Sequence, residues 1–98
     1  MAKAAGAAAR KATYTLWLSS ANTPAVELAR LLGYDGITLD LEHGVFNRES
    51  ADRLILLARQ SGLKAFARVA APTRIDIQHV LDSGADGVII PHVENAEH

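Results

Sequence analysis

Three absences in the sequence exclude several classes of protein. The chain contains no cysteine, which excludes disulfide bonds, thiolate metal sites and a cysteine nucleophile, and which fits a reducing, cytoplasmic compartment. It has 10 Lys and Arg against 11 Asp and Glu, so it lacks the basic excess that a nucleic-acid-binding domain needs. It also lacks the run of about 18 apolar residues that a membrane span requires. The sequence therefore predicts a protein that binds neither nucleic acid nor membrane.

The length and composition allow one compact domain preceded by a short segment of different character. The 98 residues are 49% hydrophobic and 21% charged, which is typical of a globular protein rather than of a disordered or collagen-like chain. Residues 1–12 are rich in alanine, lysine and arginine and contain no acidic residue. We expect this segment to be a flexible tail or a leading helix; a weak targeting or anion-contacting arm is the alternative. The domain is expected to begin at residue 13.

The rest of the sequence alternates between strand and helix patterns. Strands are predicted at 14–18, 36–41, 64–69 and 87–91. The second and fourth of these are almost entirely apolar, so we expect both faces of each to be buried. The segments 33–40 and 84–91 share the pattern Gly-x-Asp-Gly before an apolar strand, which predicts the same helix-to-strand joint twice.

Three helices are predicted between these strands, each with a side chain that can cap its first turn. They follow Asn22 or Thr23, Asn47, and Thr73, which together with Asp76 resembles a capping box. A glycine is expected to end each helix, and residues 95–98 resemble the start of a fourth. The residues expected to face the core are Val26, Leu28, Ala29, Leu31, Leu32, Ala51, Leu54, Ile55, Leu57, Ala58, Ile75, Ile77, Val80 and Leu81.

Strands that alternate with helices predict a parallel sheet, and two α/β architectures fit this order. One is a small doubly wound sheet, whose G-x-G-x-x-G dinucleotide motif is absent here. The other is part of a (β/α)8 TIM barrel, in which functional residues follow the carboxyl ends of the strands. We favour a half barrel of about four strands and three helices, because polar residues lie at or just past the carboxyl ends of several predicted strands: Ser19, Ser20, Asp40, Glu42, His43, Arg68 and His92.

The densest group of reactive side chains is Asp40, Glu42 and His43. A carboxylate beside an imidazole fixes its tautomer and raises its basicity, which makes a general base suited to neutral pH. Residues of these types are also common in solvated loops, so spacing alone leaves a structural role open.

Arg68 stands in an otherwise apolar strand, where a guanidinium needs an anionic partner. That partner is either Asp40 or Glu42 in a salt bridge, or the carboxylate or enolate of a substrate bound through two hydrogen bonds. The remaining histidines are expected to have no such role: His92 as a partly exposed residue at the strand ends, and His79 as a surface residue of its helix.

Several of these segments together resemble the HpcH/HpaI aldolases, which are class II pyruvate aldolases built on a TIM barrel. The segments are 16–19 (LWLS), 39–44 (LDLEHG), 67–69 (ARV), 80–85 (VLDSGA) and 90–97 (IPHVENAE). They occur in the family's order and with similar spacing from about residue 14 to residue 98. The combination of D-x-E-H with an arginine on the next strand carries most of the specificity.

The resemblance implies a metal-dependent lyase that cleaves 4-hydroxy-2-oxo acids to pyruvate and an aldehyde. His43 would be the acid/base and Asp40 would orient it. Arg68 would bind pyruvate and stabilise the enolate oxygen, with Trp17 and Ser19 also in the substrate site. A divalent cation (Mg, Mn or Co) would act as a Lewis acid on the oxo acid.

The resemblance also sets limits on this chain. Glu42 would support the loop, and the family's metal ligands, a Glu and an Asp on later strands, are expected to be missing. Residues 70–73 (AAPT) replace a loop that often reads Pro-Trp-Asn-Asp, and His92 stands where the family often has methionine. The first departure bears on the shape of the mouth of the substrate site.

Three hypotheses about the whole chain follow. It is the truncated N-terminal half of a pyruvate aldolase, inactive alone, and this is the hypothesis we favour. Otherwise it is a half barrel that acts with a complementary half or a second copy, or a module that binds an oxo acid without turnover. A citrate-forming, condensing relative is the alternative within the enzyme class. A half barrel also exposes two strand edges, which favour pairing with another chain.

Overall fold

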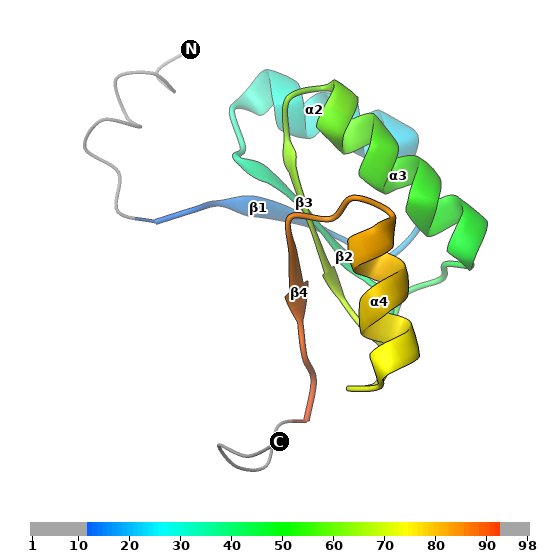
Figure 1. Ribbon diagram of the computed structural model, residues 1–98. Helices are drawn as coiled ribbons and strands as arrows, with labels where there is room; N and C mark the ends of the chain where they lie inside the picture. Colours follow the sequence, from blue (N-terminus) through cyan, green and yellow to red (C-terminus); the bar gives the residue numbers. More distant parts are fainter. Residues whose placement is uncertain (1–11, 93–98) are drawn as a thin grey trace.

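Seven elements of secondary structure alternate along the chain (Figure 1). The computed structural model describes residues 12–92. The elements are β1 (Thr15–Leu18), α2 (Thr23–Leu32), β2 (Gly36–Asp40), α3 (Arg48–Gln60), β3 (Lys64–Arg68), α4 (Arg74–Asp82) and β4 (Gly87–Ile89). The predicted order is confirmed, with boundaries that differ by one or two residues. The segment 1–11 and the fourth helix expected at 95–98 lie outside the described residues.

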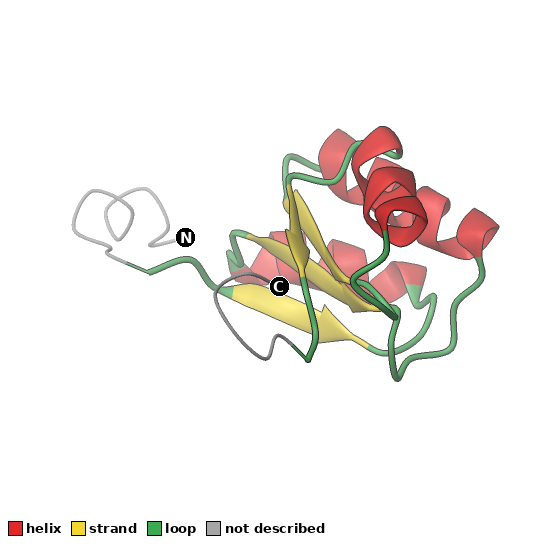
Figure 2. Cartoon of the chain, turned by 60° about the horizontal axis from the view of Figure 1, so that its bottom comes forward, coloured by secondary structure: helices red, strands yellow, loops and turns green. Residues whose placement is uncertain are grey.

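The strands form one parallel sheet in the order β1-β2-β3-β4. All three helices pack on one face of it, because their buried residues join Ile37 and Leu39 of β2 in a single core; Figure 2 shows the helices beside the twisted sheet. A doubly wound sheet reverses its strand order and carries helices on both faces. The sequential strand order therefore confirms the favoured prediction, a partial (β/α)8 barrel.

Each helix begins at a side-chain cap. Asn22 accepts a hydrogen bond from the Ala25 amide, and Asn47 forms a full capping box with Ser50. These bonds satisfy amides that have no partner within the helix. At the third helix the Thr73 hydroxyl accepts from the amide of Asp76. The capping box predicted there is only half formed, since among the described contacts no Asp76 side-chain bond returns to Thr73.

The predicted repeat of one joint is confirmed in detail. The carboxylate of Asp35 accepts from the Tyr14 amide before β2, and that of Asp86 accepts from the Ala65 amide before β4, both at 2.8 Å. In each case the aspartate's own amide donates back to the carbonyl of the same partner. Each joint begins at a left-handed glycine, Gly33 (φ 83°) or Gly84 (φ 100°).

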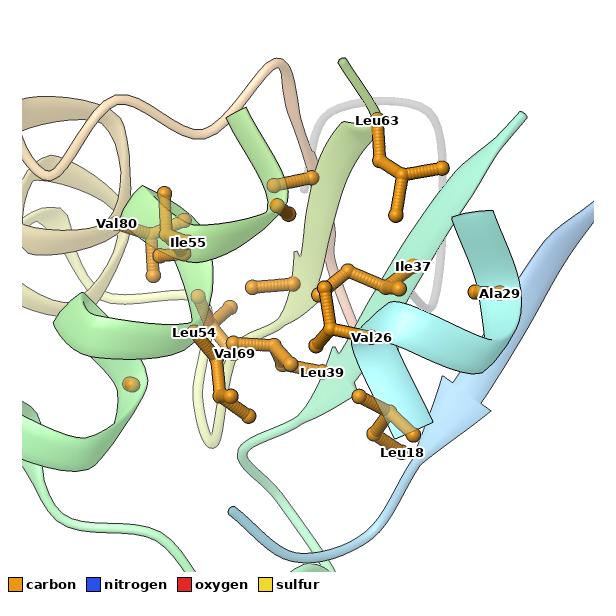
Figure 3. Packing of buried hydrophobic residues seen from close by; sticks show 14 residues of the cluster. Leu18, Val26, Ala29, Ile37, Leu39, Leu54, Ile55, Leu63, Val69 and Val80 are labelled. Carbon is orange, nitrogen blue, oxygen red and sulfur yellow. The ribbon is translucent and has the colours of Figure 1, made fainter. Parts of the chain in front are cut away.

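The core lies between the sheet and the helices (Figure 3). Side chains of β2 point into it from one side, and those of α2 and α3 from the other. The helix-facing positions of β3 are alanines, Ala65 and Ala67, both fully buried. Their small size lets α3 pack closely against the strand, with bulk supplied by Leu54 and Ile55.

The predicted apolar helix faces are too wide. Leu28, Leu31 and Leu32 of α2, and Ile75 and Leu81 of α4, are about half exposed or more. These are the two outermost helices of the row, so each has a helical neighbour on one side only. Within residues 12–92 these outer helices are therefore covered on fewer sides than α3.

The predicted burial of the fourth strand is also wrong. All five residues of β2 are buried, as expected, but Ile89 of β4 is 40% exposed. β2 has strands on both sides, whereas β4 is the last strand of the sheet. No helix in the described part of the chain is long and apolar enough to cross a membrane.

Candidate functional site

Polar side chains gather on the sheet face that points away from the helices. Successive strand residues face opposite sides, and because Ile37 and Leu39 face the core, Thr38 and Asp40 face the other side. The hydroxyls of Thr15 and Thr38 lie 2.7 Å apart across β1 and β2. Asp40 is paired in register with Arg68. The two predicted residues therefore meet at the carboxyl end of the sheet.

Asp40 is a buried carboxylate that accepts five hydrogen bonds. Arg68 donates to both oxygens, from Nε at 3.2 Å and Nη2 at 2.8 Å, and the Trp17 indole donates at 3.3 Å. The amides of Glu42 and His43 donate to Oδ1 at 3.1 and 3.0 Å. Burial alone would raise the pKa of Asp40, but these bonds and the charge of Arg68 outweigh it and lower the pKa to about 2.

Arg68 is held on two sides. One edge of its guanidinium pairs with Asp40, Nε also lies 3.4 Å from Glu42, and the group sits 5.0 Å from the centre of the Trp17 ring. Such stacking adds a cation–π attraction. Both alternatives for its partner remain compatible with the geometry, because the salt bridge is present while Nη1 has no protein partner among the described residues.

The loop after β2 carries His43 over the edge of the sheet. Its amide is tied to Asp40, and Val45 donates to the Ser19 carbonyl at 2.7 Å. Gly44 makes this close approach possible: a Cβ there would lie 2.3 Å from the Asp40 carbonyl oxygen and 2.7 Å from that of Ser19. The His43 ring is consequently left 68% exposed.

Glu42 brings together residues that the sequence did not connect. Its side chain is only 10% exposed, and Oε2 lies 2.5 Å from Nε2 of His92. The other oxygen lies 3.4 Å from Nε2 of His43. His92 is 73% exposed, as predicted, but its contact with Glu42 was missed. Its position directly after the fourth strand was the only available signal.

The other predicted residues lie close to this group. Trp17 bonds Asp40 and stacks on Arg68, whereas the exposed Ser19 contributes its backbone carbonyl to the loop. His79 was wrongly predicted to be a surface residue. Its side chain is 17% exposed, and Nε2 lies 3.0 Å from the Asp52 carboxylate, because α4 packs against α3.

The described residues do not fit a divalent cation. Among them, no group of three or more His, Asp or Glu side chains is placed to hold a metal ion. The two carboxylates of the site, Asp40 and Glu42, both pair with the positively charged Arg68, which disfavours a second cation beside them. A cavity of about 220 Å³ opens nearby, but neither His43 nor Arg68 lines it; Phe46, Arg48 and His79 do.

Comparison with known proteins places this geometry in a family. The model of the HpcH/HpaI aldolase/citrate lyase family matches residues 13–98. The chain belongs to this family. Its sequential parallel strands fit the barrel-type fold of the HpcH/HpaI aldolases among the solved structures.

Individual family members resemble the chain over most of its length. A 4-hydroxy-4-methyl-2-oxoglutarate aldolase, tasA, of Hapsidospora irregularis is 38% identical over 76 residues, which are 76% of this chain and 28% of that protein. A hydroxypyruvate/pyruvate aldolase of Agrobacterium fabrum is 34% identical over 83 residues, 84% of this chain and 31% of that protein. The crystal structure of the citrate synthase SbnG superposes with a TM-score of 0.83 at 32% identity, over 95% of this chain and 38% of that one. The HpcH/HpaI chain thus spans about a third of the length of these relatives.

Proposed function

We propose that this chain supplies the acid/base and oxo-acid-binding part of a carbon–carbon lyase. The reaction is the cleavage of a 4-hydroxy-2-oxo acid to pyruvate and an aldehyde. The observation that carries the proposal is the guanidinium of Arg68, which Asp40 holds by one edge while Nη1 stays without a protein partner among the described residues. That free edge can bind the planar oxo-carboxylate of such a substrate.

The proposed chemistry uses one base, His43, and one positively charged side chain, Arg68. His43 removes the proton from the C4 hydroxyl, the C3–C4 bond breaks, and C4 leaves as the aldehyde carbonyl. The bonding electrons remain on the other product as the enolate of pyruvate, whose oxygen Arg68 stabilises. Protonation of C3 by His43 then yields pyruvate. Asp40 holds the guanidinium in place, and Trp17 forms one wall beside it.

The remaining parts of the proposal concern the whole protein. We assign the domain to residues 13–98, as the N-terminal half of a barrel, with residues 1–12 as a tail before it. Any divalent cation that the reaction requires would be bound outside the described residues, so no step is assigned to it. The compartment is proposed to be the cytoplasm, on the absence of cysteine.

A second candidate is condensation of an oxo acid with an acceptor to form citrate. It is favoured by the likeness to a citrate synthase. Condensation and cleavage share an enolate held by a cation, so Arg68 would serve both. Substrate profiling separates them, because cleavage releases an aldehyde and condensation consumes an oxo acid.

The test is ligand binding by the purified 98-residue chain. Titration calorimetry with oxalate, a planar analogue of the pyruvate enolate, is expected to show binding that weakens at least about tenfold in Arg68→Lys, which keeps the charge but loses the fork. His43→Gln is the matched control and should bind oxalate normally. Failure of the folded wild-type chain to bind oxalate would refute the proposal.

The same chain is then assayed for pyruvate release from a 4-hydroxy-2-oxo acid with added Mg²⁺ or Mn²⁺. We expect no turnover, because the described residues do not form a metal site. Release of pyruvate that is lost in His43→Gln would show that the chain is complete as an enzyme.

A further inference from the structure

Carboxylates outnumber the guanidinium of Arg68 in the described site. Asp40 pairs with Arg68 through two hydrogen bonds, and Oε1 of Glu42 lies 3.4 Å from its Nε. The pKa of Asp40 is lowered to about 2, so this carboxylate is ionised at neutral pH. The Glu42 side chain is only 10% exposed, so water and salt screen its charge poorly. Two negative charges beside one positive charge would repel an anionic oxo acid.

A further ionisable side chain reaches this group from the end of the fourth strand. Nε2 of His92 lies 2.5 Å from Oε2 of Glu42 and forms a hydrogen bond with it. β3 lies between β2 and β4 in the sheet, so this bond passes over the strand end that carries Arg68. The fold therefore brings His92 to the same carboxylate that pairs with Arg68.

The backbone of His92 is unusual for a residue that is not glycine. Its φ of +56° is the one positive value at a non-glycine residue among those described. Side chains rarely tolerate this left-handed conformation, and residues that adopt it gather at binding and catalytic sites. The bond to Glu42 is the interaction that holds the His92 ring in the described structure.

His43 is a poor source of positive charge for Glu42. Its Nε2 lies 3.4 Å from Oε1 of Glu42, without a hydrogen bond among the described contacts, and its side chain is 68% exposed. In the reaction proposed above, His43 must be neutral when the substrate binds, because it takes the proton of the C4 hydroxyl. A charge that offsets Glu42 must therefore come from His92, the remaining histidine in contact with it in the described part of the chain.

We infer that His92 is the second cationic residue of the oxo-acid site. Its imidazolium pairs with Glu42 and offsets the charge of that carboxylate, so that Arg68 can attract the carboxylate of the substrate. The inference rests on the function proposed above, which supplies the anion that Arg68 binds. His92 acts on the substrate through charge, and His43 keeps its place as the base.

This role makes the affinity for an oxo acid depend on pH. Imidazoles gain their positive charge between about pH 8 and pH 5, so the attraction should strengthen as the pH falls through that range. The charged and titratable groups of the cluster come from β2 and its loop (Asp40, Glu42 and His43), from β3 (Arg68) and from the end of β4 (His92).

Oxalate titration of the 98-residue chain at two pH values tests the inference. His92→Gln is the informative variant, because its amide can still donate a hydrogen bond to Glu42 but carries no charge. At about pH 6, where imidazoles are mostly charged, we expect this variant to bind oxalate up to about fivefold more weakly than the wild type, the order of one partly exposed charge. At about pH 8, where imidazoles are mostly neutral, the two proteins should bind alike.

Two further variants locate the effect. The weakening by His92→Gln at the lower pH should remain in a His43→Gln background, because His43 is not its source. At the higher pH, Glu42→Gln should bind oxalate more tightly than the wild type, because it removes a charge that neutral His92 no longer offsets. Circular dichroism at both pH values checks that each variant is folded.

The outcomes separate this inference from the proposed function. Equal oxalate binding by the wild type and His92→Gln at the lower pH would overturn the inference. Equal weakening at both pH values would also overturn it, because it would show a structural role without charge. A folded wild type that binds no oxalate at either pH would instead refute the proposed function, and this inference with it.

Discussion

Asp40 shows how one residue can balance the charges of a site. Taking a carboxylate out of water is unfavourable unless donors replace the lost hydration. Here two backbone amides, an indole and a bidentate guanidinium replace it. The same bonds orient Arg68 and fix the start of the loop that carries His43. Stability and site geometry are therefore linked through a single side chain.

This link predicts a pH dependence of stability. The pKa of Asp40 is lowered to about 2 from an ordinary value of 3.8, so its contribution is complete above about pH 4 and is lost as the pH falls toward 2. The size is about 2 kcal/mol. Urea unfolding of the wild type and Asp40→Asn is measured from pH 7 to pH 2. The difference between their free energies of unfolding should shrink as the pH falls from about 4 to 2. A difference that stays constant over that range would contradict the assignment.

Removing the partner of Asp40 should cost more than removing Asp40 itself. Arg68→Leu leaves a buried carboxylate unpaired, which typically costs about 3 kcal/mol or more. Asp40→Asn combined with Arg68→Leu removes that charge, so the double variant should be more stable than Arg68→Leu alone. Urea unfolding at pH 7 measures all three. Additive losses would show that the two side chains are not coupled.

At the scale of elements, the loop between β2 and α3 depends on one glycine. A Cβ at Gly44 would lie 2.3 Å from the Asp40 carbonyl oxygen, a backbone atom that cannot move without shifting β2. Gly44→Ala should cost about 1–3 kcal/mol and weaken oxalate binding, because the loop must retreat from Ser19 and Asp40.

Gly62→Ala is a matched comparison for this loop. Gly62 has a φ of +79° but nothing within 4 Å of a Cβ position. Its substitution should cost about 1–2 kcal/mol from backbone strain alone and leave oxalate binding unchanged. Circular dichroism and calorimetry of both variants check this; equal effects on binding would contradict a special role for the loop.

The elements themselves were largely predictable, and their burial was less so. Caps at Asn22 and Asn47 and stops at Gly33 and Gly84 act within a few residues, so local sequence carries them. The exposure of Ile89 and Leu31 could not be predicted in this way. It depends on which elements flank β4 and α2, and that is decided by sheet order.

At the scale of the whole molecule, the described wall of the barrel is open. Within residues 12–92, no strand pairs with the outer edge of β1 or β4. Large apolar side chains of α2 are about half exposed, among them Leu28 and Leu31. A closed barrel has neither feature, because its edges are paired and each helix has two neighbours.

The open wall predicts association. We expect light scattering on the eluting chain to give a mass above the monomer's 10.5 kDa, from pairing with a second copy or, when it is added, a complementary barrel half. Leu28→Glu with Leu31→Glu should shift the protein toward monomer, while Glu49→Gln on α3 is a control. A wild-type chain that is folded and monomeric at every concentration would count against this.

The sequence by itself determined the alternation of strands and helices, the caps, the repeated Gly-x-Asp-Gly joint and the residue types of the site. These follow from interactions between residues near one another along the chain. Only the tertiary structure decided that Asp40 is shared by Arg68, Trp17 and the loop, and that Glu42 lies between His43 and His92. Those contacts join residues up to 50 positions apart, and they depend on strand register and on a carboxylate's need for donors once it is buried.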